Sequence, residues 1–155
     1  MTKKFPLQRV LEFKEQVEDL LEIQVAGIEG HRQELQQRVD HLREKWGESS
    51  CAQQSEGGQL LDPAEGELVA VYLDALDRTI QSEQQSLENV QRELEHKRIE
   101  LGAAYQEREI LKKLKAKQEA AERLAEQRRD TRALEDVATQ QYVRRNADAG
   151  PGGVV

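Results

Sequence analysis

Residues 73–101, LDALDRTIQSEQQSLENVQRELEHKRIEL, carry an apolar side chain at every seventh position: Leu73, Ile80, Leu87, Leu94 and Leu101. A repeat of seven residues keeps one side of an α-helix apolar and is typical of a coiled coil. The stretch contains neither proline nor glycine, so nothing within it interrupts a helix. It therefore predicts a long helix with a single apolar seam.

A second repeat of the same period lies earlier in the chain, at Leu7, Leu21, Ile28, Leu35 and Leu42, with Lys14 at the one remaining position. Between the two repeats, residues 47–66 carry the obvious break in the pattern, and residues 47–59 within it are small and polar. Two seams separated by one polar break predict an all-α fold: an antiparallel two-helix coiled-coil hairpin.

Start and stop signals set the expected boundaries. Pro6 suits a first helical turn, and Asp62 followed by Pro63 and Glu65 is a helix-start pattern. We expect one hairpin domain over residues 5–145, with helix 1 at 6–46, a polar connection at 47–62, a longer helix 2 at 63–144 and a disordered tail at 146–155. The apolar register of helix 2 is expected to slip after Leu101.

Composition limits what such a chain can do. It is 34% charged, 37% hydrophobic and 4% aromatic, which is a coiled-coil profile without the material for a thick core. The net charge of −7 argues against nucleic acid as a partner. No stretch approaches the ~20 apolar residues of a membrane span, and the start lacks the apolar core of a secretory signal. The single cysteine, Cys51, fits a reducing compartment, so a cytoplasmic location is expected.

Catalytic and metal chemistry find no support in the pattern. His31, His41 and His96 do not form the paired Glu-x-x-His sets of bundle metal sites, and the acidic residues between Glu12 and Glu22 would lie on a solvated face. No glycine-rich phosphate loop is present. We therefore expect no enzyme activity, no catalytic residue, no metal and no cofactor.

Two features suggest docking instead. A basic run in helix 2 is either a solvated face with i,i+4 ion pairs or a docking patch for an acidic protein surface: Arg108, Lys112, Lys113, Lys115 and Lys117. Trp46 and Tyr72 flank the connection, where they either cap the seam or serve as interface anchors.

The predicted helices differ in length, and this mismatch has a consequence. Helix 1 can pair with about the first half of helix 2 only, which leaves an apolar stripe in the rest of helix 2 without an intramolecular partner. Such a stripe usually requires another protein. A generic scaffold that forms homodimers through this half of helix 2 is one reading of the pattern.

The sequence resembles the FliJ family, whose members are small components of the bacterial flagellar type III export apparatus. The resemblance rests on four segments in order: residues 5–11 (FPLQRVL), 72–76 (YLDAL) continuing to Ile80, 107–115 (EREILKKLK), and 134–138 (LEDVA) with Tyr142. Together these segments span nearly the whole chain, from Phe5 to Arg145.

The resemblance implies a function that periodicity alone does not. Members form an antiparallel hairpin similar to the central stalk of rotary ATPases, insert into the hexameric export ATPase, contact the cytoplasmic domain of the export-gate membrane protein and bind export chaperones. Such a protein would be peripheral at the inner face of the cell membrane, held there by its partners, and would serve flagellum assembly and motility. The related stalk of a virulence-type injectisome is the other reading.

Carried onto this sequence, the resemblance assigns two sets of contact residues. The export-gate set lies near the connection: Leu42, Trp46, Tyr72 and Leu76. The ATPase-ring set lies where helix 1 begins and helix 2 ends: Val10, Leu11, Leu134, Val137 and Tyr142.

Overall fold

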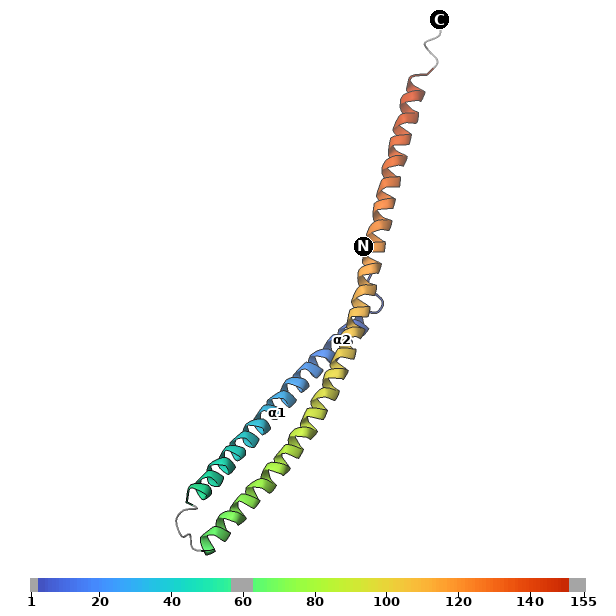
Figure 1. Cartoon of the computed structure of the whole chain (residues 1–155). Coiled ribbons are helices and arrows are strands. Elements are labelled where there is room, and N and C mark those ends of the chain that lie inside the picture. Colours follow the sequence, from blue (N-terminus) through green and yellow to red (C-terminus); the bar gives the residue numbers. More distant parts are fainter. Residues whose placement is uncertain (1–2, 57–62, 151–155) are drawn as a thin grey trace. The chain divides into compact units, whose positions relative to one another are not determined.

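The computed structural model describes residues 3–56 and 63–150, and these are almost entirely helical. Helix α1 spans Gln8–Glu56 and helix α2 spans Pro63–Asp148, with no strand in the described ranges (Figure 1). The chain divides into two compact units. The hairpin unit is Lys14–Gln106, and the terminal unit combines Met1–Phe13 with Glu107–Val155.

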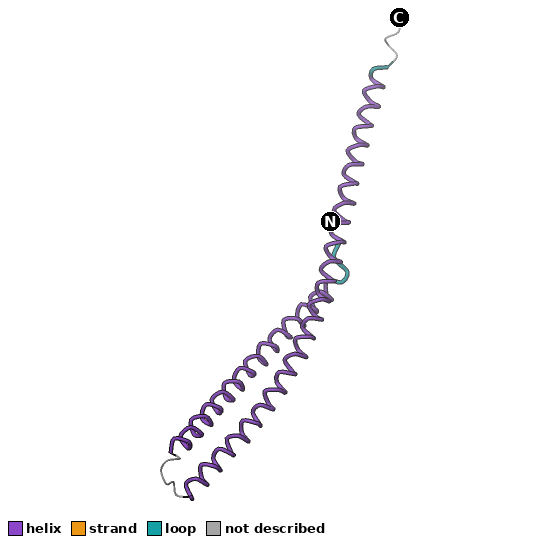
Figure 2. Tube along the Cα trace, in the orientation of Figure 1, coloured by secondary structure: helices purple, strands orange, loops and turns teal. Residues whose placement is uncertain are grey.

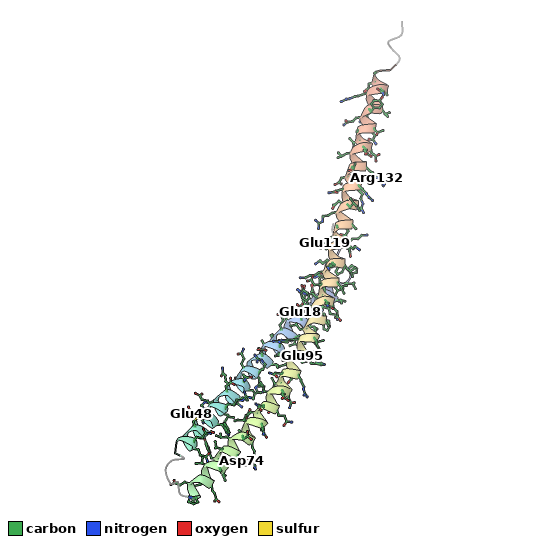
Figure 3. The ribbon with its side chains drawn as sticks, in the orientation of Figure 1. Glu18, Glu48, Asp74, Glu95, Glu119 and Arg132 are labelled. Carbon is green, nitrogen blue, oxygen red and sulfur yellow. The ribbon has the colours of Figure 1, made fainter. Side chains whose placement is uncertain are left out.

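Within the hairpin unit, α1 and the first half of α2 run antiparallel and side by side (Figure 2). Glu48 of α1 and Asp74 of α2 lie toward the same end of this unit (Figure 3). The predicted all-α antiparallel hairpin with a longer second helix is confirmed.

The predicted end of helix 1 at residue 46 is wrong, because α1 continues for ten more residues to Glu56. Gly47, Ser49, Ser50 and Gln53 are partly buried, so this small and polar stretch still has one covered side. The helix propensity of single residues is a weak guide, because packing against the rest of the protein can outweigh it. Here the low propensity of these residues did not mark the end of the helix. Residues 57–62, the rest of the predicted connection with its Asp62 cap, lie outside the described residues.

The other boundaries lie close to their predicted positions. The Gln8 N–H donates to the Phe5 carbonyl at 3.0 Å, which closes a turn through Pro6 before α1 begins. Helix α2 begins at Pro63 as expected and ends at Asp148, four residues past the predicted 144, so the start of the predicted disordered tail is helical. Residues 151–155 of that tail lie outside the described residues.

Apolar side chains spaced alternately by three and four residues form the seam of the hairpin unit. On α2 the buried members are Leu76, Ile80, Leu87, Leu94 and Ala104, and on α1 they are Leu35 and Val39, of which Val39 is only 1% exposed. Burying one such side chain fully stabilises the fold by about 1.5–3 kcal/mol relative to leaving it exposed. The seam is one layer thick, so its stability is distributed along its whole length.

Polar residues occupy several positions of the same seam. Glu18 is 7% exposed, and Lys14, Arg32, Glu83 and Lys97 are partly buried at the intervening three- and four-residue steps. Long side chains such as lysine and arginine can cover a seam with their methylene groups while the charge remains in water. The apolar repeat visible in the sequence is therefore only part of the seam.

A polar contact through Glu29 joins the two helices directly. Glu29 of α1 accepts hydrogen bonds from Arg32 at 2.6 and 3.1 Å through one oxygen and from Arg98 of α2 at 3.1 Å through the other. The hydrogen bond from Arg32, with the charges of Arg32 and Arg98, holds the pKa of Glu29 below its ordinary value. The carboxylate thus links α1 to α2 near the middle of the hairpin unit.

In the terminal unit, the partly buried positions of α2 keep the spacing of the seam. Arg108, Leu111, Lys115, Gln118 and Glu122 follow alternating steps of three and four residues, and Glu109 is partly buried beside them. The predicted slip in register after Leu101 is therefore wrong for the covered side of the helix. Residue type changes instead, because polar side chains take the covered positions while Ile110 and Leu114 are exposed.

The N-terminal segment contributes to a groove in the terminal unit. Lys3 and Phe5 line an open groove of about 630 Å³ together with residues of α2 between Lys115 and Arg129. Three carboxylates are among those residues: Glu119, Glu122 and Glu126. Lys115, Arg123 and Arg129 line the groove too, so the segment before α1 lies beside a part of α2 that carries both charges.

Candidate docking surfaces

The predicted export-gate set divides into buried and exposed members. Trp46 and Tyr72 are 40% and 48% exposed, whereas Leu76 is a buried seam residue and Leu42 is partly buried. Leu76 lies three residues after Leu73, at the second position of the same heptad, so it faces the other helix rather than solvent. The structure removes Leu76 from the surface available to a partner.

Sequence reasoning missed a neighbouring surface on α2. Eight exposed residues at helical spacing form an uncharged face, here defined as Ala64, Leu68, Val71, Tyr72, Ala75, Thr79, Ser82 and Ser86. Leu68 and Val71 are 70% and 68% exposed. The sequence did indicate this face, because residues 68, 71, 72 and 75 are uncharged and follow helical spacing. It was overlooked because the seam repeat beside it is longer and more regular.

Two hydroxyl groups on this face donate hydrogen bonds to carbonyl groups of the helix itself. The Thr79 hydroxyl donates to the Ala75 carbonyl at 2.9 Å, and the Ser86 hydroxyl donates to the Ser82 carbonyl at 3.2 Å. At the border, Arg78 pairs with Asp74 at 2.9 Å. In a chain that is 34% charged, an exposed face without a charge and with large apolar side chains at one end is suited to protein contact.

The predicted ATPase-ring set divides in the same way. Leu134, Val137 and Tyr142 are 71%, 51% and 67% exposed and Val10 is 41% exposed, but Leu11 is 3% exposed. Leu11 is therefore packed within the protein and offers no surface. Its burial follows from a column of α1 at intervals of seven, Leu11, Glu18, Val25, Arg32 and Val39, in which charged residues hide the repeat.

The predicted basic patch does not form one surface. Arg108 and Lys115 are partly buried at seam spacing, and Arg108 pairs with Glu109 at 3.5 Å. Lys112, Lys113 and Lys117 are exposed. Lys113 and Lys117 are one helical turn apart on one side of α2, while Lys112 lies on another side.

A long part of α2 has no covered side at all. Every residue from 123 to 149 is exposed, including the large side chains of Leu124, Leu134, Val137, Tyr142 and Val143. An isolated helix in water is only marginally stable, because most helical stability in proteins comes from packing.

The two units differ in charge. The hairpin unit contains 9 Lys and Arg against 20 Asp and Glu, whereas the terminal unit contains 14 against 10. The net charge of −7 is therefore the sum of a negative charge on the hairpin unit and a smaller positive charge on the terminal unit. Electrostatic complementarity to a partner must be judged for each unit separately.

Residues with potential for chemistry lie apart from one another. Among the described residues no group of three or more His, Cys, Asp or Glu side chains is placed to hold a metal ion, and no helix there could cross a membrane. His96 lies 3.0 Å from Glu100, one turn away on the same helix, and Cys51 is an exposed free thiol.

Comparison with known proteins identifies the family. No curated protein and no solved structure matches the chain. The family described as "Flagellar FliJ protein" matches residues 3–147, which include both helices almost in full. With two helices arranged as the resemblance implied and a match over nearly its whole length, the chain belongs to the FliJ family of flagellar proteins.

Proposed function

We propose that this protein is a non-enzymatic stalk and adaptor of the flagellar type III export apparatus. The terminal unit inserts in the export ATPase hexamer, and the hairpin unit docks on the cytoplasmic domain of the export gate and on export chaperones. The protein is cytoplasmic and is held at the inner face of the cell membrane by these partners.

The observation that carries this proposal is the stretch of α2 from 123 to 148, in which every residue is exposed. Its helical state without any covered side fits a segment that is completed by another protein. Family membership identifies flagellar export as the setting and favours it over a virulence-type injectisome.

The uncharged face supports the gate-docking part of the proposal. Leu68 and Val71 lie on the same face of α2 as Tyr72 and enlarge the exposed part of the gate set. They take the place of Leu76, which is buried. Tyrosine is over-represented among the residues that dominate binding energy at interfaces, which makes Tyr72 the expected anchor.

Co-purification of the full chain with the export ATPase and with the gate domain tests both contacts. Binding to both is expected, and binding to neither would refute the proposal. The double variant Leu68→Ala, Tyr72→Ala should weaken gate binding while leaving ATPase binding unchanged. The matched control is Leu20→Ala, Ile23→Ala, which removes two exposed apolar side chains from α1 of the same unit and should bind the gate normally.

A homodimeric scaffold uses the same exposed helix in a different way. Light scattering over a range of concentrations separates the two functions. A monomer at all concentrations agrees with the stalk, whereas an obligate dimer that fails to bind the ATPase supports the scaffold.

A further inference from the structure

Within the terminal unit, one side of α2 combines apolar and basic residues. The apolar members are Ile110, Leu114, Ala121 and Leu124, of which Ile110, Leu114 and Leu124 are 59%, 45% and 49% exposed. The basic members are Lys113, Lys117, Arg128 and Arg132, and all four are exposed. These eight residues recur at steps of three and four, so they share one side of the helix, here named the basic apolar face.

Carboxylates of the same stretch follow a separate stripe. Glu119, Glu122, Glu126 and Asp130 are also spaced by three and four residues. Glu119, Glu126 and Asp130 each lie two residues after a member of the basic apolar face, which is about 200° around a helix that turns ~100° per residue, and Glu122 lies about 100° past Ala121. No acidic residue therefore falls on the basic apolar face between Ile110 and Arg132.

The N-terminal segment lies beside the side of α2 that carries the carboxylate stripe. Lys3 and Phe5 share a groove with Glu119, Glu122 and Glu126, and Lys115, Arg123 and Arg129 line the same groove. None of Lys113, Lys117, Arg128 and Arg132 forms an ion pair among the described residues, whereas Arg123, which lies off this face, pairs with Glu119 at 3.9 Å. The four cations of the basic apolar face are thus without counter-charges within the unit.

We propose that the basic apolar face docks in an acidic groove of the export ATPase, with Ile110, Leu114 and Leu124 entering apolar pockets and Lys117 and Arg128 facing carboxylates at the rim. This inference rests on the proposed function and assigns the chemistry of its ATPase contact. It also extends that contact along α2 from the segment with Leu134, Val137 and Tyr142 back to Ile110.

The mixed composition of the face favours a protein over a membrane. A helix that lies in a lipid surface separates its cations from its apolar side, so that the apolar side alone is immersed. Here Lys117 lies between Leu114 and Ala121 on one side of the helix, so immersion would bury a charge. A protein groove can place a carboxylate opposite each cation and an apolar pocket opposite each leucine.

The test compares two charge-reversed forms of the full chain. The face variant is Lys117→Glu, Arg128→Glu, and the control, on the other side of α2, is Lys112→Glu, Arg123→Glu. Both change the net charge by the same amount on the same exposed stretch of α2, and far-ultraviolet circular dichroism verifies that both remain helical. Their affinities for the export ATPase are measured beside the wild type at two salt concentrations.

We expect the face variant to bind the ATPase about tenfold more weakly or worse and the control to bind within about twofold of wild type, because two rim ion pairs become repulsive contacts in the face variant alone. Wild-type binding should also weaken with salt more steeply than binding of the face variant. Equal losses in the two variants, with wild-type binding intact, would overturn this inference but not the proposed function.

Other outcomes are also decisive. If the wild type does not bind the ATPase, the proposed function fails and this docking face fails with it. Flotation with vesicles of phosphatidylglycerol and phosphatidylcholine forms the second arm. Vesicle binding that the face variant loses, together with unchanged ATPase binding by that variant, would assign the face to a lipid surface and overturn the proposal.

Discussion

Glu29 and Arg98 lie 69 residues apart in the chain and meet across the hairpin unit, with the Arg98 guanidinium 3.1 Å from the Glu29 carboxylate. Arg32 binds the other oxygen of the same carboxylate from one turn away on α1. A heptad seam tolerates sliding by whole repeats, because one apolar position resembles the next. A carboxylate held between two arginines from different helices supplies a position-specific contact that the repeat lacks.

The linked carboxylate predicts an acid-sensitive contribution to stability. The folded-state pKa of Glu29 is lowered, so its contribution is complete above the ordinary glutamate pKa of about 4.3 and is lost as the pH falls through the lower folded-state value. Urea unfolding followed by circular dichroism should show a smaller loss of stability in acid for Glu29→Gln than for wild type. Glu95→Gln, which removes an exposed carboxylate of α2, is the control and should retain the wild-type pH dependence. Parallel pH profiles for wild type and Glu29→Gln would contradict the prediction.

Two glycines in the middle of α1 predict a simple route to a more stable protein. A Cβ atom added at Gly27 or Gly30 would meet nothing within 4 Å, so neither glycine serves a close approach of helices. Alanine favours a helix interior over glycine by about 0.5–1 kcal/mol, and Gly30→Ala should raise the free energy of unfolding by that amount. Thermal unfolding provides the measurement, and Ala26→Gly, the reverse change one turn earlier, should lower the melting temperature. A fall in stability for Gly30→Ala would mean that the glycine has a role in the fold.

The hairpin could be predicted from the sequence because one column of the seam is apolar at every seventh residue, at Leu73, Ile80, Leu87 and Leu94. The second column could not be recognised in the same way. On α1 the second column includes the apolar Leu11 and Val39 but also the charged Glu18 and Arg32. These charged residues break the apolar pattern in the sequence although their positions are covered in the fold. The docking residues Leu11 and Leu76 were misassigned for this reason. The end of α1 was missed because packing on one side of this stretch can outweigh the poor helix propensity of its glycine and serine residues.

Truncating two leucines of the same helix should have unequal effects on the stability of the fold. Leu76 is buried in the seam, whereas Leu68, two turns earlier on α2, is 70% exposed. Truncating a buried leucine typically costs about 2–5 kcal/mol, so Leu76→Ala should lower the free energy of unfolding by about 2 kcal/mol or more. Leu68→Ala should change it by less than about 0.5 kcal/mol, since surface substitutions rarely do more. Equal effects in urea unfolding would show that Leu76 is not a seam residue in solution.

The uncovered part of α2 predicts a region of low local stability in the free protein. Amides between Arg123 and Asp148 lie on a helix without a covered side, so their hydrogen exchange should be fast, while amides around Leu87 and Leu94 exchange slowly because the seam must open first. Mass spectrometry of peptides from the exchanged full chain resolves the two regions. Adding the export ATPase should slow exchange between Arg123 and Asp148 and leave the peptide around Leu87 unchanged, because only the former gains a packing surface. Slow exchange in both regions before any partner is added would show that the free chain already covers this helix, for example by pairing with a second copy.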